Sequence, residues 1–414
     1  MIVGAMPEQA PVRMALRLNR LQETMAAEER LLLLSAGDRG NDGAMREVAR
    51  GPVDWARFLG LAQLERAVPV VYPRLRRVAA DLVDPDTLEK MRRLAMVSDF
   101  AMLHLETRLR ESLQVLDSAG IRVLLLKGAA LASSAYSGVR NRPMSDVDIL
   151  VDPSNAALAR RLMLGAGWRE LDGGIPAEVY ERHHHLPPLY DAKSTDLQLE
   201  IHTSLFPLRQ PFALDVSDLW KRAKPLGSPT PNVFVPDGSH LLLHACLHFL
   251  WSHQGRFGVW RTIRDVNALT RHDAVDWDAF VHLALESRGG TSCYWTFRIA
   301  DLTAGVTIPE TVVERLRPPR SAYMLQAIER HFVRNLFPVA FACPSVTLDH
   351  ALWELAVMPG WSGHGDIRPW DEEGDFTPPA DSGVRPRRER FRQLLASSGY
   401  IGTLLRSRPA PDVR

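Results

Sequence analysis

The chain has 414 residues, 46% hydrophobic and 24% charged, which is the composition of a globular protein with room for two or three domains. Lys and Arg total 50 against 49 Asp and Glu, so the net charge of +1 lacks the general basic excess of nucleic-acid-binding proteins. Because there is no membrane-length apolar run, no secretion signal and no paired pattern among the three cysteines, we expect a soluble cytoplasmic protein without a membrane partner.

Residues 1–95 are predicted to form an N-terminal helical region. In VDWARFLGLAQLERAVPVVYPRLRR the apolar residues recur at helical spacing, and Pro69 and Pro73 punctuate the segment. A second helix is predicted from about Asp86 to Ala119. It ends at Gly120, in the position where a left-handed cap is common.

Residues 96–226 are predicted to form an α+β (α/β) domain, because short strands begin at Ile121. IRVLLLKG and MSDVDILVD are expected strands, and AALASSAY and SNAALARRLMLGAGW are the helices that follow them. HHHLPPLY and DLQLEIHTSLF are expected to form two further strands, with a hairpin around Asp191 to Thr195. This order fits a small mixed sheet with helices packed on it.

Residues 227–361 are predicted to form a C-terminal helical domain. One of its helices begins in VDWDAFVHLALESRG, where Asp276 is the expected N-cap. Residues 362–414 are expected to be a linker followed by a basic tail, with an amphipathic helix around RPRRERFRQLL.

Asp146 and Asp148 are the residues that first suggest chemistry. Roughly six acidic-x-acidic matches are expected by chance in a chain of this composition, so their context decides. On a strand both carboxylates point the same way, while Val147 and Ile149 face the core. Two such acids repel each other unless a cation lies between them, which favours a metal site over the alternative of a solvated strand edge.

Glu200 is the expected third carboxylate. Two-metal phosphoryl transfer needs a clamp that is usually built from three acids, so a further acid is expected on a neighbouring strand. In LQLEIH the apolar residues alternate with Gln198, Glu200 and His202, which places Glu200 on the polar face. Taken alone, Glu200 would be read as an ordinary exposed strand residue.

These residues resemble the pattern of an uncharacterised bacterial nucleotidyltransferase family within the DNA polymerase beta-like superfamily. That pattern, LKG-x-x-L, Y, R-x-x-x-D-x-D-x-L-V, is matched here by Leu126, Lys127, Gly128, Leu131, Tyr136, Arg142, Asp146, Asp148, Leu150 and Val151. The similarity extends from about residue 25 to residue 300. The resemblance implies a polymerase beta-like core, two metal ions bound by Asp146 and Asp148, and Glu200 as a ligand of the catalytic ion that also helps to deprotonate the acceptor.

Five further residues are candidates for nucleotide binding. Gly128, at a strand-to-helix turn, lets the backbone approach phosphate, and Lys127 beside it has the length to reach a triphosphate. Arg142 is placed to neutralise phosphates, with Arg140 and Ser145 as weaker candidates. The wider superfamily has Gly-Gly or Gly-Ser where this chain has Gly128-Ala129, so other donors must replace the serine hydroxyl.

The histidines are assigned to the substrate side or to structure. In a strand only His183 and His185 of the HHH tract would share a face, so a substrate-side or structural role is favoured over zinc. His202 shares the Glu200 face and is the better acceptor-side candidate, with His185 second. HACLH, with His244 and His248, lacks the glutamate of a metalloprotease motif. His272-Asp273 resembles a phosphohydrolase dyad but falls in an expected loop, and Asp265 is a weak candidate for contact with base or acceptor.

The resulting functional hypothesis is an EC 2.7.7-type enzyme that transfers NMP from an NTP, with ATP as the expected donor, and releases pyrophosphate. Two Mg²⁺ ions, or Mn²⁺, are the expected cofactors, and a small metabolite or a peptide is the expected acceptor. Two alternatives stay open. One is a toxin-like tRNA nucleotidyltransferase, favoured by the Arg385 to Arg392 cluster, and the other is a non-catalytic nucleotide-binding or scaffold protein. No pattern specifies an oligomeric state.

Overall fold

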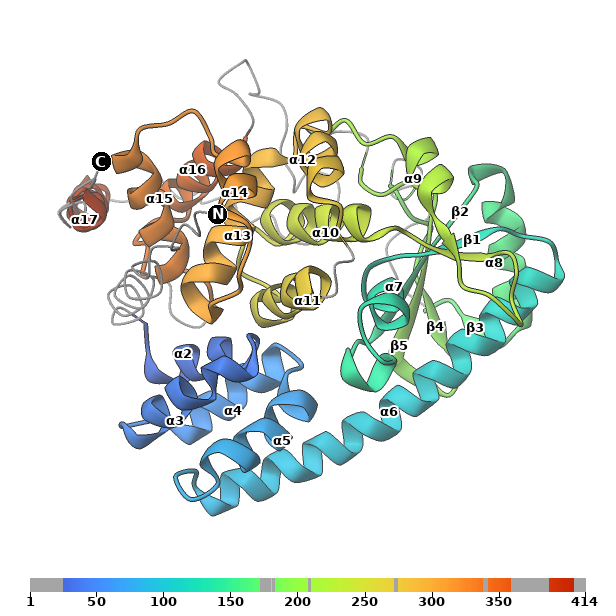
Figure 1. Cartoon of the computed structure of the whole chain (residues 1–414), viewed down its shortest axis with the longest axis horizontal. Coiled ribbons are helices and arrows are strands. Elements are labelled where there is room, and N and C mark those ends of the chain that lie inside the picture. The colour runs from blue at the N-terminus through green and yellow to red at the C-terminus, as the bar shows by residue number, and fades with distance from the viewer. Residues whose placement is uncertain are drawn as a thin grey trace, which may run out of the picture.

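The computed structural model describes residues 25–171, 180, 183–207, 210–271, 275–337, 342–358 and 387–405. Within these ranges, helical regions flank a mixed seven-stranded sheet, so the predicted α+β class with helical flanks is confirmed (Figure 1). The His272-Asp273 pair, most of the predicted linker and the side chains of the Arg385 to Arg392 cluster lie outside the described residues. No helix of the described ranges combines the length and the apolarity that a membrane crossing requires.

The N-terminal region is a bundle of short helices. Its members are α2 (Ala27–Leu34), α3 (Asp42–Arg50), α4 (Trp55–Leu64) and α5 (Val68–Ala79), with the 3₁₀ turn η1 (Arg39–Asn41). The Asp54 side chain accepts a hydrogen bond from the Arg57 backbone N–H and caps α4. Between α4 and α5 the chain turns at Arg66, where φ is 53°, so the apolar stretch predicted as one helical segment forms two helices.

Helix α6 (Pro85–Ser118) joins this bundle to the sheet (Figure 1). Asp84 caps its start, and Gly120 follows its end with φ of 70°, as the sequence predicts. The N-terminal part of α6 packs on α5, and its C-terminal part packs on the sheet domain. The boundary predicted at residues 95/96 therefore falls inside one continuous helix.

The sheet has the strand order β3-β4-β5-β2-β1-β7-β6. Its strands are β1 (Val123–Leu125), β2 (Asp146–Val151), β3 (Trp168–Arg169), β4 (Leu189–Asp191), β5 (Ser194–His202), β6 (Lys224–Pro225) and β7 (Val233–Val235). Strands β2 and β5 are parallel neighbours, as are β1 and β7, whereas the remaining pairs are antiparallel. The helices between the strands are α7 (Lys127–Ser134), α8 (Ala156–Gly165) and α9 (Val216–Arg222), with the 3₁₀ turns η2 (Val139–Asn141) and η3 (Pro153–Asn155).

The predicted strands β1, β2 and β5 and the hairpin between β4 and β5 are all present. The HHH tract does not form the predicted strand, since the backbone bends at His183 and His184 and makes only a single bridge, from His185 to His202. The domain boundary predicted at residues 226/227 falls within the sheet. It separates β6 from β7, and these two strands are paired in the sheet.

The C-terminal region is helical, as predicted. It contains α10 (Gly238–Leu247), the π-helical turn η5 (His248–Ser252), α11 (Val259–Arg271), α12 (Trp277–Glu286), α13 (Gly290–Ala304), α14 (Glu310–Leu316), α15 (Ala322–Arg334), α16 (Val346–Val357) and α17 (Arg387–Leu405). Asp276 caps α12 by accepting from the Ala279 N–H at 3.1 Å, which confirms its predicted place. Helix α10 lies between the sheet and the other C-terminal helices (Figure 1).

A buried ion pair fastens α11 to the loop that precedes β2. Nε and Nη2 of Arg142 donate to the two carboxylate oxygens of Asp265 at 2.7 and 2.8 Å, and the Tyr136 hydroxyl donates to the same carboxylate at 2.8 Å. Burial alone would lower the pKa of Arg142, but the Asp265 carboxylate outweighs it and raises that pKa. In this structure the fork of Arg142 is held by Asp265, and the Asp265 carboxylate is used within the fold.

We expect Arg142→Met to lower the free energy of unfolding by about 3–5 kcal/mol, because it leaves the Asp265 carboxylate buried without its cation. The double variant Arg142→Met/Asp265→Asn should recover most of that loss, since the amide oxygen still accepts from Tyr136 and carries no charge. Denaturant titration of the three proteins measures the difference. Equal instability of the single and double variants would contradict the stabilising role of the Arg142–Asp265 ion pair.

Candidate active site

The register of β2 and β5 brings the predicted carboxylates together. These strands are parallel, with Asp146 opposite Gln198 and Asp148 opposite Glu200. Asp148 is 1% exposed, whereas Asp146 is half-buried at the start of β2. Oxygens of Asp148 and Glu200 and a nitrogen of His202 lie within 4.8 Å of one another. The period-2 alternation of LQLEIH therefore places Glu200 beside Asp148, where the sequence predicts it.

Lys127 supplies the positive charge between these acids. Its Nζ lies 2.7 Å from Oδ1 of Asp148 and 3.8 Å from Oε2 of Glu200. Burial would lower the pKa of Lys127, but Asp148, Glu200 and Asp146 together raise it above its usual value. Lys127 is the first residue of α7, and its φ of 43° is a left-handed conformation that costs a non-glycine residue roughly 1–2 kcal/mol. In this structure Lys127 thus points at the carboxylates.

His202 contacts the carboxylates of Asp148 and Glu200 from the interior of the protein. It is completely buried, and its Nε2 is 2.9 Å from Oδ1 of Asp148 and 3.3 Å from Oε2 of Glu200. Burial would lower the pKa of His202, but hydrogen bonds to the two carboxylates raise it. Burial likewise would raise the pKa of Asp148 and of Glu200, and Lys127 together with His202 lowers both. The two acids are therefore ionised at neutral pH, and both contact Lys127 and His202.

The HHH tract packs against His202. The rings of His184 and His185 each lie 5.2 Å from the His202 ring, and the His185 ring lies 4.8 Å from that of His184. Burial lowers the pKa of His184, and it lowers that of His185 to about 4 although Glu200 opposes the shift. The prediction that only His183 and His185 share a face is wrong, because the backbone bends there and turns all three rings toward one another.

Gly128 and Ser145 shape the approach to Asp146. A Cβ on Gly128 would stand 3.1 Å from Sδ of Met144, so the glycine allows α7 to pack closely on the segment that leads into β2. The Ser145 hydroxyl lies 3.4 Å from Oδ1 of Asp146, and its backbone carbonyl accepts from the Gln198 N–H. Arg140 is exposed on η2.

Arg261 is a candidate that the sequence did not indicate. It lies near the start of α11, where burial lowers its pKa and the carboxylate of Glu65, followed by that of Asp146, partly offsets the effect. Among the described residues its guanidinium makes no hydrogen bond or ion pair. A Cβ on Gly258, where φ is 65°, would lie 3.1 Å from Nη2 of Arg261, so the glycine leaves room for this side chain. In VWRTIRDV nothing separates Arg261 from an ordinary surface arginine.

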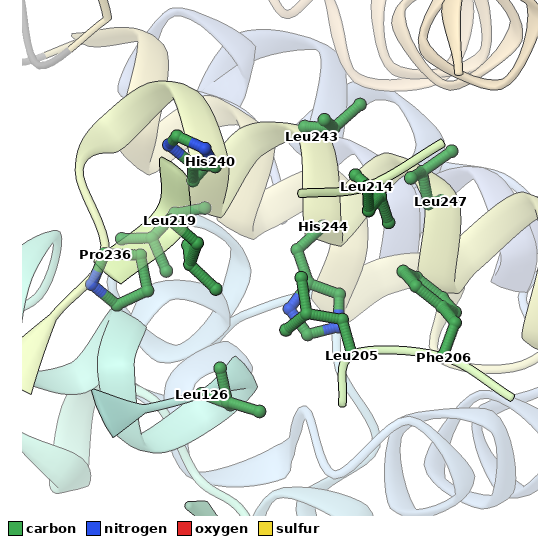
Figure 2. A pocket seen from close by; sticks show the side chains of 11 residues that line it. Leu126, Leu205, Phe206, Leu214, Leu219, Pro236, His240, Leu243, His244 and Leu247 are labelled. Atoms are coloured by element: carbon green, nitrogen blue, oxygen red, sulfur yellow. The ribbon is translucent and has the colours of Figure 1, made fainter. Parts of the chain in front are cut away.

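An apolar pocket lies next to the site, between the end of β1 and α10. Figure 2 shows Leu126, Leu205, Phe206 and His244 among its lining side chains. Its volume of about 10 Å³ is room for roughly one water molecule, far too little for a nucleotide. Burial lowers the pKa of His244 to about 3, so this histidine is neutral and belongs to an apolar contact.

Comparison with known proteins agrees with this geometry. No curated protein and no solved structure matches the chain. A family model described as "Uncharacterised nucleotidyltransferase" matches residues 51–305, which include the N-terminal helices from α4 onward, the whole sheet and the helices up to α13. The matched span covers more than half of the chain and contains Lys127, Asp146, Asp148 and Glu200. The protein belongs to this nucleotidyltransferase family.

Proposed function

We propose that the protein is a metal-dependent nucleotidyltransferase that moves NMP from an NTP, ATP being the expected donor, to a nucleophile on a small metabolite or peptide. The observation that carries the proposal is the in-register pairing of β2 with β5, which places Asp148 beside Glu200. Asp146 lies two residues earlier on β2, on the same face of the strand. Side-by-side acids at the edge of a sheet need positive charge, and divalent metal ions that also bind the triphosphate would supply it.

The donor set fits magnesium. Asp146, Asp148 and Glu200 offer the hard carboxylate oxygens that Mg²⁺ prefers, and Nζ of Lys127 marks a position at which Asp148 and Glu200 already hold a cation. Magnesium or manganese ions, when bound, would neutralise the phosphate oxygens and lower the pKa of the attacking hydroxyl.

The protein's own residues would position the reactants and accept a proton. The acceptor oxygen forms a bond to the α-phosphorus, the bond from that phosphorus to the bridging oxygen breaks, and pyrophosphate leaves with the bonding electron pair. The ionised Glu200 carboxylate takes the proton of the acceptor hydroxyl. Arg261, whose guanidinium lies near Asp146, would hold the leaving phosphates.

The central test incubates the full-length protein with each NTP labelled on the α-phosphate, Mg²⁺, and an acceptor pool of small metabolites, peptides or total tRNA. We expect label in the metabolite or peptide pool and release of pyrophosphate. Asp146→Asn/Asp148→Asn and Glu200→Gln should each reduce transfer by at least about a thousandfold, as expected when the charge-stabilising groups of a transition state are lost.

The same assay separates the alternatives. Label that appears only in tRNA would replace the metabolite or peptide acceptor with the toxin-like reaction. Tight NTP binding without transfer to any pool would support a nucleotide-binding protein instead. Transfer that survives the aspartate double variant would remove the carboxylates from the mechanism.

Lys127→Met should have opposite effects on metal binding and on stability. Because Nζ competes with a metal ion for Asp148, its removal is expected to tighten Mn²⁺ binding in the absence of nucleotide by about tenfold or more, roughly 1.4 kcal/mol. The metal-free variant should be less stable than the wild type, since two buried carboxylates lose a cation. Calorimetric titration with Mn²⁺ and thermal melting measure the two effects.

Lys193→Met is the matched control, because Lys193 is exposed in the turn between β4 and β5. It should change neither quantity. If Lys127→Met left nucleotide-free Mn²⁺ affinity unchanged, Lys127 would have no part in holding the metal position.

Arg261→Met is expected to weaken NTP binding by about 10- to 100-fold, the loss of one charge-assisted contact to phosphate. Arg169→Met provides the control, since Arg169 is exposed on the edge strand β3. Equilibrium binding of a fluorescent NTP analogue in Mg²⁺ compares the two variants with the wild type. Equal affinity of all three proteins would exclude Arg261 from the nucleotide site.

A further inference from the structure

Three consecutive histidines converge beside the carboxylate centre. The ring centres of His183 and His185 are 5.0 Å apart, those of His184 and His185 are 4.8 Å apart, and those of His183 and His184 are 5.7 Å apart. One nitrogen from each ring lies within 4.8 Å of the others. The bend at His183 and His184 produces this triangle, which an extended strand would not allow.

The spacing of the rings matches that of imidazoles around a single ion. Three imidazoles on a tetrahedral zinc-class metal, with metal–nitrogen bonds of about 2.0–2.1 Å, place their ring centres roughly 5 Å apart. The three observed separations lie within about 0.7 Å of that value. Packed aromatic rings also lie about 4.5–7 Å apart, as His202 does from His184 and His185, so the triangle supports a ligand set only together with the convergence of one nitrogen from each of the three rings.

The hydrogen bonds leave nitrogens available for a metal. The His185 Nδ1–H donates to the backbone carbonyl of Leu186 at 2.8 Å, which leaves Nε2 with its lone pair. The Nδ1 atom of His184 is buried and has no hydrogen-bond partner among the described residues. A backbone acceptor behind one ring and an unused buried nitrogen beside it are the surroundings in which histidine ligands are found.

We propose that His183, His184 and His185 form a binding site for a transition-metal ion of the zinc class, distinct from the carboxylate centre. The His202 ring lies between the two sites, because its Nε2 contacts Asp148 and Glu200 while its ring faces His184 and His185. The donor sets also differ, since neutral imidazole suits zinc, cobalt and nickel whereas carboxylates suit magnesium. Three protein ligands leave a fourth position open for water or another oxygen ligand.

Cobalt(II) is the probe that tests the site, because its visible absorption reports on coordination. Full-length protein is stripped with a chelator and titrated with Co²⁺ in excess Mg²⁺, which occupies oxygen sites. We expect one equivalent of Co²⁺ with the strong absorption of four-coordinate nitrogen-rich cobalt. The same spectrum is expected for Asp146→Asn/Asp148→Asn, even though that variant should lose transfer activity.

His183→Gln/His185→Gln should weaken Co²⁺ binding at least about a hundredfold, since two of three ligands are lost. His282→Gln is the matched control, because His282 is an exposed histidine on α12 whose side chain is 72% accessible. Circular dichroism verifies that each variant is folded. Unchanged Co²⁺ affinity in the double-histidine variant, or its loss in the aspartate variant instead, would overturn the proposal.

X-ray absorption of the zinc-loaded wild-type protein provides a readout that needs no variant. The expected spectrum contains scattering from about three imidazole rings at zinc–nitrogen distances near 2.0 Å. An oxygen-only shell, or failure of the wild type to retain zinc after gel filtration, would equally overturn the site. Neither result depends on whether the protein transfers nucleotides.

Discussion

Like charge on adjacent strands is the constraint on which the centre of this protein depends. Because β2 and β5 run parallel in register, Asp148 and Glu200 lie side by side, with oxygens within 4.8 Å. Two unit charges 4 Å apart repel each other by about 4 kcal/mol at the effective dielectric of a protein near its surface. This repulsion is large against the 5–15 kcal/mol by which a typical domain is stable. The fold must therefore hold positive charge at this position.

Lys127 and His202 meet this requirement from opposite sides. His202 is buried and lies two residues after Glu200, on the same face of β5. Lys127 contacts the carboxylates from the start of α7, just after β1. The left-handed backbone at Lys127 then has a physical reason, since it directs the ammonium group at Asp148 at a cost smaller than the repulsion it relieves. Such an arrangement keeps the acids ionised and leaves their countercharge exchangeable. This property is what a site for metal-bound triphosphate requires.

Local periodicity was sufficient to predict the central strands β1, β2 and β5 and the side-by-side placement of Asp148 and Glu200, but not β3, β6 or β7. Alternation in DVDILV and LQLEIH orients each acid relative to its own neighbours. The parallel pairing of β2 with β5 is known only from the structure. The ion pair between Arg142 and Asp265 could not be predicted in this way, because its partners are 123 residues apart and meet only through the packing of α11. Arg261 was missed for the same reason. The predicted domain limits at 95/96 and 226/227 fall within helix α6 and between the paired strands β6 and β7, because each of these contacts is made by chain packing that local patterns do not show.

The histidine tract shows how a bend of two residues changes the chemistry of a sequence. In an extended strand His184 would face away from its neighbours, and two imidazoles make a poor metal site. The bend instead turns all three rings inward, and the bridge from His185 to His202 anchors them to the strand that carries Glu200. Nitrogen donors and oxygen donors thus lie on the two sides of one buried imidazole. If each of the two proposed sites binds its ion, a charge on either side changes the field at His202, so each ion is expected to affect the binding of the other.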